Sequence, residues 1–434
     1  MASSSSSCPP RARRWWARSW GDACRSSPRS NSCPSASTRP CGGRNGYTRS
    51  WSRCRGTPAG RRRSAAPRAR GGGRESPARS SWWRRAAPKG PSGRPGTSSS
   101  ATASPRVSVL LPVRDGQDTL PACLGSLFSQ TFADHEVVAV DDGSSDATPA
   151  ILAAAAESDA RLRVVRTPPR GLVAALNTGL AHVRGALVAR MDADDVCHRD
   201  RLALQVEGLE DDPRCAILGC GVDAGDAAGG MRDYVAWLNR LLTHEDIVRD
   251  LLVESPLVHP SVMMRAEVMR DLRGYRAFDG PEDYDLWLRA HAGGWRFGKR
   301  AEVLLEWRDR PGRLTRADRR YAAERFRDLK LDALARGPLR APRRVVVWGA
   351  GPVGKGWARA LRARGHDVAA FVEVDHRKIG QRIHGARVVD VAGAAAFRGP
   401  LHLAAVGRPG ARARIRAAAR ALGLREGDDL IAVA

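Results

Sequence analysis

The chain has 434 residues and a formal net charge of +26, and its length allows two or three domains with hydrophobic cores of their own. Residues 1–105 hold 22 Lys and Arg but only 2 acidic residues, so the rest of the chain is nearly balanced and a nucleic-acid-binding function is not expected. The nine cysteines lack zinc-ligand spacing and no run of about 18 apolar residues occurs, which argues against a zinc site, a disulfide framework and a membrane-spanning helix.

Residues 1–105 are rich in Ser, Arg, Pro and Gly and show neither helical nor strand periodicity, so we expect disorder. The N-terminus also lacks the apolar core of a secretory signal. Three interpretations stay open: an RGG-like nucleic-acid arm, an organelle transit peptide, or upstream DNA translated from a start codon placed too early. The Trp pairs and scattered cysteines favour the last of these.

From Arg106 onward, apolar runs alternate with segments of helical periodicity. The predicted strands are Val107–Val113, His135–Asp141, Arg161–Arg166, Ala186–Met191 and a short one around Pro213–Val222. The predicted helices are Asp118–Gln130, an Ala-rich helix ending near Ala156, and Leu172–Val183. This alternation predicts an α/β fold with a doubly wound, mostly parallel sheet covered on both faces.

A second change of pattern falls at Gly337–Pro342, after which Arg343–Trp348 opens a separate βαβ pattern. We therefore predict three segments: a disordered basic segment at 1–105, an α/β domain at 106–337, and a small Rossmann-like domain at 342–434.

Two acidic clusters follow predicted strands. Asp141 and Asp142 end the second strand, and Asp192, Asp194 and Asp195 follow the fourth. Because ligands of parallel sheets bind beyond the carboxyl ends of the strands, we expect both clusters at one edge. Asp192 and Asp194 are two residues apart and point the same way in extended backbone, which suits Mg²⁺ or Mn²⁺. The alternative is that such residues make turns or cap the next helix, as we expect for Asp195.

A third acidic cluster, Glu282 and Asp283, follows Pro281, which fits the first position of a helix. One of these carboxylates could act as a general base on a hydroxyl group. The alternative is that both only interact favourably with the helix dipole.

Taken together, these motifs resemble glycosyltransferase family 2, the inverting enzymes of the GT-A fold. The resemblance covers about Arg106–Gly337. It is carried by VSVLLPVRDGQDTLPACLGSLFSQTF (Val107–Phe132), VVAVDDGSSDAT (Val137–Thr148), RGLVAALNTGLAHVRGALVARMDADD (Arg170–Asp195), HPSVMMR (His259–Arg265) and GPEDYDLWLRA (Gly280–Ala290).

The resemblance implies a role for each matching residue. The nucleotide-sugar side would comprise Pro112, Val113, Asp141, Asp142, Asn177, Arg190 and Asp192. Asp194, with Asp192, would bind the divalent metal, Mn²⁺ or Mg²⁺, and the diphosphate. Asp283, with Glu282 beside it, would be the catalytic base, and His259 would line the acceptor side. A buried, hydrogen-bonded structural histidine is the alternative for His259.

The segment Val303–Tyr321 is unusually rich in arginine and resembles a subset of the family in which WR-x-x-P-x-R-x-(S/T)-R follows the core. Arg308, Arg313 and Arg316 could bind a diphosphate or an anionic acceptor. A solvated basic helix start is the alternative.

The C-terminal pattern contains Gly349, Gly351 and Gly354 as G-x-G-x-x-G between a predicted strand and a helix. A second strand at Val368–Val374 places Glu373 about twenty residues on, where an acid can meet a ribose hydroxyl. Gly356 stands where a P-loop needs Ser or Thr, which excludes a Walker-type site. Two interpretations stay open for this module: these residues form a second nucleotide site, or the module only packs against the larger domain.

The resemblance implies an inverting glycosyltransferase that moves a sugar from a nucleoside-diphosphate sugar to a glycan or lipid-linked acceptor in surface polysaccharide or glycoconjugate synthesis. We expect it in the cytoplasm, with peripheral association at the inner face of the membrane as a second option. An NAD(P)-dependent oxidoreductase or nucleotide-binding protein centred on the glycine-rich motif is the alternative, but it leaves the acidic clusters unexplained.

Overall fold

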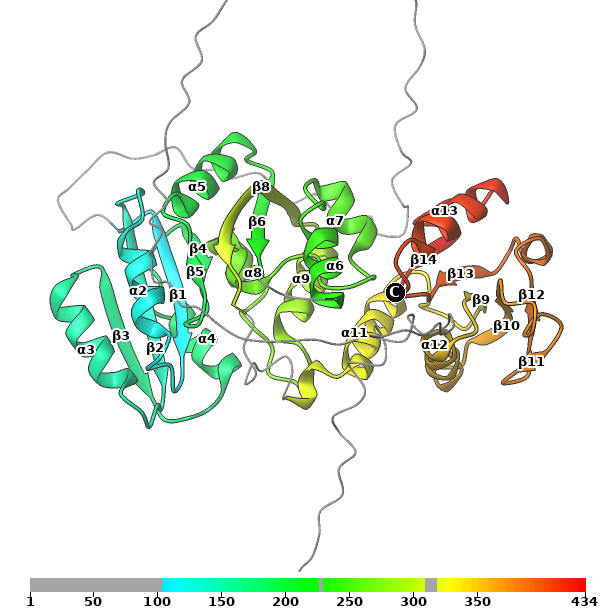
Figure 1. Cartoon of the computed structure of the whole chain (residues 1–434), viewed down its shortest axis with the longest axis horizontal. Helices are drawn as coiled ribbons and strands as arrows, with labels where there is room; N and C mark the ends of the chain where they lie inside the picture. Colours follow the sequence, from blue (N-terminus) through cyan, green and yellow to red (C-terminus); the bar gives the residue numbers. More distant parts are fainter. Residues whose placement is uncertain (1–103, 226–228, 309–317) are drawn as a thin grey trace, which may run out of the picture. The chain divides into compact units, whose positions relative to one another are not determined.

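The computed structural model describes residues 104–225, 229–308 and 318–434, which all belong to one compact unit, Ser80–Ala434. Within it, an eight-stranded and a six-stranded sheet are each flanked by helices (Figure 1). This confirms the predicted α/β class, with a mostly parallel first sheet followed by a second, C-terminal sheet. Disorder is predicted for residues 1–105. Of these, residues 1–103 lie outside the described ranges.

The first sheet has the strand order β3-β2-β1-β4-β7-β6-β8-β5. Its strands are β1 (Val107–Val113), β2 (His135–Asp142), β3 (Leu162–Thr167), β4 (Leu187–Arg190), β5 (Val196–Cys197), β6 (Cys215–Asp223), β7 (Met263–Arg265) and β8 (Arg296–Glu306). Strands β3, β2, β1 and β4 pair in parallel, as do β6 and β8. The pairs made by β7 and β5 are antiparallel, so the sheet is mostly, but not entirely, parallel.

The helices that accompany this sheet are α2 (Leu120–Phe128), α3 (Thr148–Ser158), α4 (Leu172–Leu180), α5 (Arg201–Asp211), α6 (Gly230–Leu238), α7 (His244–Asp250), α8 (Ala266–Asp271), α9 (Glu282–Ala292) and α11 (Ala323–Ala335), with 3-10 turns η2 (His259–Ser261) and η3 (Arg319–Tyr321). Helix α2 is shorter than predicted at both ends.

The unbroken apolar sequence of β1 reflects its position in the sheet, which has a hydrophobic cluster on each face. Val109 and Leu111 belong to one cluster and Leu110 to the other. Helix α4 lies close to the sheet at Gly179, where a Cβ atom would come within 2.2 Å of the Leu110 side chain. Apolar residues on both faces are expected for a strand in the middle of a parallel sheet.

Parallel pairing brings the acidic strand ends to one edge of the sheet. Val113 at the end of β1 pairs with Asp141 of β2, and Leu110 pairs with Arg190, the last residue of β4. The residues after β2 and β4 therefore leave the sheet at the same edge, as the sequence predicts.

The second sheet has the order β11-β12-β10-β9-β13-β14, and only the β11–β12 pair is antiparallel. Its strands are β9 (Arg344–Trp348), β10 (Asp367–Val372), β11 (Arg382–Ile383), β12 (Ala386–Val389), β13 (Leu401–Ala404) and β14 (Leu430–Ala432). Helices α12 (Pro352–Ala363) and α13 (Ala411–Ala421) and the 3-10 turn η4 (Gly393–Ala396) complete this Rossmann-like arrangement.

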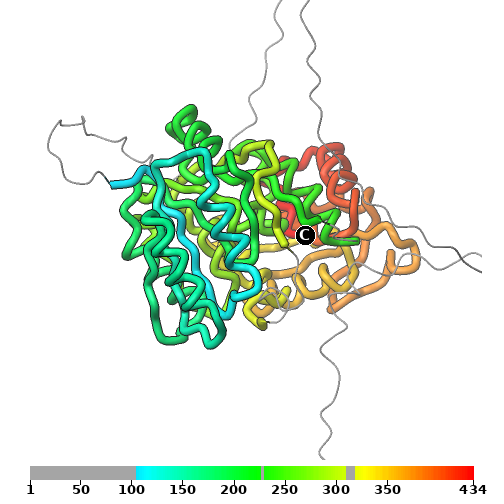
Figure 2. The backbone as a smooth tube through the Cα atoms, turned by 60° about the vertical axis from the view of Figure 1, so that its left-hand side comes forward, coloured from blue at the N-terminus to red at the C-terminus, as the bar shows by residue number. Residues whose placement is uncertain are grey.

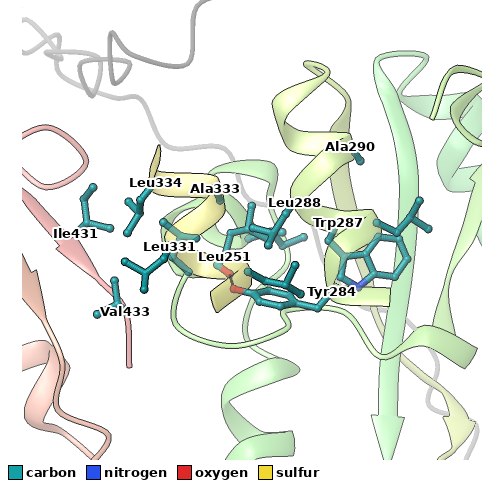
Figure 3. Packing of buried hydrophobic residues seen from close by; sticks show 14 of the residues in the cluster. Leu251, Tyr284, Trp287, Leu288, Ala290, Leu331, Ala333, Leu334, Ile431 and Val433 are labelled. Atoms are coloured by element: carbon teal, nitrogen blue, oxygen red, sulfur yellow. Dashed lines mark hydrogen bonds between the residues drawn. The ribbon is translucent and has the colours of Figure 1, made fainter. Parts of the chain in front are cut away.

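The C-terminal sheet packs against helix α11, and both views show the end of the chain beside that helix (Figures 1 and 2). One hydrophobic cluster includes Leu288 of α9, Leu334 of α11, and Ile431 and Val433 near the C-terminus (Figure 3). The buried Lys330 adds polar contacts, because its Nζ donates to the carbonyl oxygens of Val253 at 2.7 Å and Val433 at 3.3 Å. The domain division at 337–342 stays a prediction, and a continuous core runs across it.

We expect Leu334→Ala to lower the free energy of unfolding by about 2–5 kcal/mol, because truncating a fully buried leucine leaves a cavity. Since the core is shared, both sheets should unfold in one transition, which urea titration followed by circular dichroism and Trp fluorescence can test. Val303→Ala is the control, because Val303 is 52% exposed. Two separate transitions in the wild-type chain would contradict a shared core.

In the described ranges, no helix combines the length and the apolar character needed to cross a membrane.

Candidate active site

The end of β2 forms the predicted nucleotide side of the site. Asp141 is buried, its Oδ1 accepts a hydrogen bond from the backbone N–H of Ser144 at 2.9 Å, and its Oδ2 lies 3.4 Å from Nε of Arg166. Both oxygens of Asp142 accept backbone N–H groups, from Arg170 and Gly171, each at 2.8 Å. Asp142 therefore shapes the loop before α4, whereas Asp141 keeps its Oδ2 without a hydrogen-bond partner.

An open cavity of about 440 Å³ lies beside Asp141. It is lined by Gly143, Ser144, Arg166, Thr167, Pro168 and Pro169. Gly143 has φ +69° and approaches Pro169 so closely that a Cβ atom would lie 2.6 Å from the proline ring. Glycine is therefore required at this turn, and the two loops together form one wall of the cavity.

The turn after β4 carries three carboxylates that converge. One oxygen from each of Asp192, Asp194 and Asp195 lies within 4.8 Å of the others. Carboxylate oxygens are the ligands that Mg²⁺ and Mn²⁺ prefer, so this donor set fits a divalent cation.

The structure corrects the interpretation of Asp195 as a helix cap. Asp195 is fully buried, α5 begins only at Arg201, and Oδ1 of Asp195 accepts the backbone N–H of Arg308 at 2.9 Å. Arg308 thus contributes its backbone here, while its side chain pairs with Glu306. Arg313 and Arg316 lie outside the described residues.

Arg190, at the end of β4, lies between the three-carboxylate turn and the residues predicted to line the acceptor side. Its guanidinium group is 2% exposed, forms an ion pair with Asp192, and leaves Nε without a hydrogen-bond partner. Its positive charge also acts on Glu282, Asp283 and His259. The carboxylates on the two sides of the site therefore share one buried cation.

Helix α9 begins at Glu282, so Pro281 occupies the N-cap, with φ −67° and ψ 114°, and not the first helical position as predicted. Oδ1 of Asp283 accepts the backbone N–H of Tyr284 at 2.7 Å. Burial, followed by the negative charge of Glu282, raises the pKa of Asp283 to about 8. A carboxylate with such a pKa can accept a proton near neutral pH, which is the property that a general base needs.

Glu282 is buried, and burial raises its pKa as well. The phenol of Tyr321 donates a 2.7 Å hydrogen bond to its Oε2, which opposes this shift. Glu282 also lies 3.9 Å from Nδ1 of His259. Glu282 is thus held by its neighbours, while the partly exposed Asp283 is the more accessible acid of the pair.

His259 lies in η2 and shares a 2.7 Å hydrogen bond between its Nε2 and the phenol of Tyr275. Burial, then the charge of Arg190, keeps the pKa of His259 well below its usual value, so the ring is neutral. The amide of Asn177 exchanges two 2.9 Å hydrogen bonds with the backbone of Tyr275. Asn177 therefore contacts the site through Tyr275, next to His259 and not beside the predicted nucleotide residues of β2.

Two residues of this site, Tyr275 and Tyr321, are missing from the sequence-based prediction. Tyr275 follows Gly274 directly, and Tyr321 ends the arginine-rich segment. Neither tyrosine belongs to a periodic or acidic pattern. The only signal in the sequence is that each lies close to a segment that is predicted to form the site.

In the C-terminal sheet, the glycines meet steric demands of the loop. Gly349 has φ +101°, and a Cβ atom at Gly354 would lie 1.8 Å from the Gly349 carbonyl oxygen, whereas a Cβ atom at Gly351 would meet nothing within 4 Å. Glu373 accepts the backbone N–H groups of Ala350 and Val374, each at 2.9 Å. Its carboxylate is thus used within the fold, and nucleotide binding at this module stays a prediction.

Comparison with known proteins identifies relatives of this chain. Residues 108–273 match the model of glycosyl transferase family 2. The amylovoran biosynthesis glycosyltransferase AmsE of Erwinia amylovora is 32% identical over 197 residues, which cover 45% of this chain and 72% of AmsE. The chain belongs to glycosyltransferase family 2. EpsE of Bacillus subtilis (strain 168) is another relative of this glycosyltransferase. It is 32% identical over 212 residues, which cover 48% of this chain and 74% of EpsE.

Solved structures are similar to the glycosyltransferase at lower identity. TarS 1–349 of S. aureus in complex with UDP-GlcNAc gives a TM-score of 0.44 at 18% identity, covering 54% of this chain and 67% of TarS 1–349. The mannosyltransferase PcManGT of Pyrobaculum calidifontis, in complex with GDP-Man and Mn²⁺, gives a TM-score of 0.43 at 22% identity, covering 74% of this chain and 81% of PcManGT.

Proposed function

We propose that this glycosyltransferase is an inverting enzyme that moves a sugar from a nucleoside-diphosphate sugar to an acceptor hydroxyl group. The observation that carries the proposal is the buried Arg190, which is ion-paired with Asp192 and whose charge acts on Asp283. A metal-binding turn and a candidate base thereby share one site. A single displacement needs this arrangement, because the leaving diphosphate and the attacking hydroxyl lie on opposite sides of the anomeric carbon.

In the proposed reaction, Asp283 accepts the proton of the acceptor hydroxyl while its oxygen forms a bond to the anomeric carbon. The bond from that carbon to the phosphate oxygen breaks, the nucleoside diphosphate leaves with the electron pair, and the configuration inverts. Asp192, Asp194 and Asp195 would hold Mn²⁺ or Mg²⁺, which offsets the charge of the leaving diphosphate. Asp141 and the cavity beside it would hold the nucleoside.

The acceptor proposed is a glycan or a lipid-linked saccharide, in surface polysaccharide or glycoconjugate synthesis at the inner face of the membrane. The name of AmsE, a protein of amylovoran biosynthesis, supports a polysaccharide product. The oxidoreductase alternative receives no support from the contacts of Glu373, which is engaged by the backbone of its own module.

The full chain should be incubated with a panel of UDP-, GDP- and dTDP-sugars, with and without Mn²⁺, and the release of nucleoside diphosphate measured. We expect metal-dependent release from one class of donor, and NMR of the product should show an inverted anomeric configuration. Retention of configuration would overturn the single displacement. Reduction of NAD(P)⁺ without any release from the sugars would favour the alternative.

A further inference from the structure

A fully buried arginine lies next to the metal-binding turn and takes no part in the reaction proposed above. Arg201, the first residue of α5, is 1% exposed. Its Nη2 donates to the carbonyl oxygens of Arg190 at 2.8 Å and Val262 at 3.3 Å, and its Nη1 lies 3.3 Å from the sulfur of Met191. The guanidinium group therefore contacts the two residues that directly precede Asp192.

Gln205, one turn further along α5, completes the arrangement and is itself fully buried. Its Oε1 accepts a 3.0 Å hydrogen bond from Nε of Arg201. Its Nε2 donates to the carbonyl oxygens of Leu218 at 2.8 Å and Ser261 at 2.9 Å. Together the two side chains bind four backbone carbonyl groups on three neighbouring parts of the sheet.

These carbonyl groups belong to the segments that carry the site. Arg190 ends β4 and leads into the acidic turn, while Ser261 and Val262 follow His259 and Pro260 and lead into β7. Ser261 is the last residue of η2, the turn that presents His259 beside Glu282. The pair thus holds the metal side and the acceptor side at a fixed separation.

The chemistry of the pair is specific to this task. Only a planar guanidinium group offers several donors in fixed directions, and a lysine at the same place would be a single flexible point charge. Among the described residues Arg201 forms no ion pair with an acidic side chain, so its buried charge is compensated by carbonyl oxygens and by Gln205. A role in stability alone would be met more simply by a packed apolar side chain.

We propose that Arg201 and Gln205 are positioning residues that set the geometry of the metal-binding turn relative to the His259 turn. This inference rests on the proposed function, because it assumes that the acidic turn binds a divalent cation.

The test uses the full chain and Mn²⁺ alone as the probe, with free Mn²⁺ followed by its electron paramagnetic resonance signal. We expect Arg201→Lys to weaken Mn²⁺ binding by about 10- to 100-fold, as is typical when groups that orient metal ligands are changed. Arg199→Met is the matched control, because Arg199 precedes α5 on the same segment and its side chain is 69% exposed. Its Mn²⁺ affinity should equal that of the wild type.

If Arg201→Lys does not fold, Gln205→Met keeps the proposal testable, since it nearly keeps the volume but removes three hydrogen bonds. With an active donor in hand, both variants should lower kcat more than they raise KM for the donor, because the ground-state contacts of the nucleotide remain. A lowered Tm with unchanged Mn²⁺ affinity and unchanged kcat would overturn the proposal, because Arg201 and Gln205 would then contribute only to stability. Absence of sugar transfer by the wild type, with the Mn²⁺ differences intact, would overturn the proposed function and not this inference.

Discussion

Replacing Asp283 by asparagine should lower kcat by about 10²- to 10⁴-fold, the range that a positioned general base contributes. Asparagine has nearly the same shape and can keep the hydrogen bond that the N–H of Tyr284 donates to Oδ1 of Asp283, so the helix start should survive. It cannot accept the proton of the acceptor hydroxyl. Donor binding should change little, because the residues predicted to bind the nucleotide belong to other segments. Steady-state kinetics and a donor-binding titration check both parts.

The pH dependence gives a second measurement on the same residue. Because burial, and then the charge of Glu282, raise the pKa of Asp283 to about 8, the base is largely protonated in the free enzyme at neutral pH. The value of kcat/KM for the wild type should therefore rise as the pH increases through about 8. In Asp283→Asn this rise should be absent from the residual activity.

The same pKa also has a consequence for stability. The folded state holds the proton on Asp283 at pH values where the unfolded chain has released it, so the contribution of this residue to stability is lost as the pH rises from the unfolded pKa toward about 8. Asp283→Asn should therefore be more stable than the wild type at pH 8, with little difference at pH 4. Tm values from pH 4 to 9 test the sign.

Asp279→Asn is the matched control, because Asp279 precedes the same helix, is 59% exposed and pairs only at the surface with Arg325. It should leave kcat and both pH profiles unchanged. Near-wild-type turnover in Asp283→Asn would remove Asp283 from its role as the base. Glu282 would then be the next candidate, although its bond to Tyr321 makes it the less accessible acid.

The parts of the site that follow from local pattern could be predicted from the sequence. Each acidic cluster directly follows a strand or begins a helix, and parallel strands place their carboxyl ends at one edge. The position of the three-carboxylate turn after β4 and that of the acidic start of α9 could thus be predicted from the order and spacing of the elements alone.

Contacts between distant segments could not be predicted in this way. Asp195 looks like a cap locally, but its partner Arg308 is 113 residues away. Asn177 bonds to Tyr275 across 98 residues, and Tyr321 reaches Glu282 across 39. The local pattern of a single sequence does not show which later loop packs against an earlier segment. These contacts are therefore known only from the tertiary structure.

The burial of charged side chains could not be predicted from the sequence either. An arginine at the start of a helix is usually solvated, and nothing in the sequence around Arg201 marks it as buried. Its side chain is buried against Arg190, Met191 and Val262, which lie in segments that the topology of the sheet brings together. The same reasoning applies to Lys330. Its partners are Val253, which lies between α7 and η2, and Val433, which follows β14 of the second sheet.

Replacing Asp194 by asparagine should impair the reaction through the metal. The change removes one negative charge from the three-carboxylate turn, so the Mn²⁺ concentration needed for half-maximal activity should rise. We expect kcat/KM at a fixed Mn²⁺ concentration to fall by about 10²- to 10³-fold, because a metal at the leaving group supplies several kcal/mol of charge stabilisation. Kinetics at increasing Mn²⁺ concentrations measure both quantities.

Asp192→Asn should behave differently, and the comparison separates the two residues. Asp192 is ion-paired with Arg190, so its loss leaves a buried guanidinium group without that partner, which is strongly unfavourable. We therefore expect Asp192→Asn to lower Tm as well as activity, whereas Asp194→Asn should mainly change the Mn²⁺ response. Asp211→Asn, at an exposed position of α5, is the control for both. If Asp194→Asn kept the wild-type Mn²⁺ response, Asp194 could not be a metal ligand, and Asp192 and Asp195 would have to bind the cation without it.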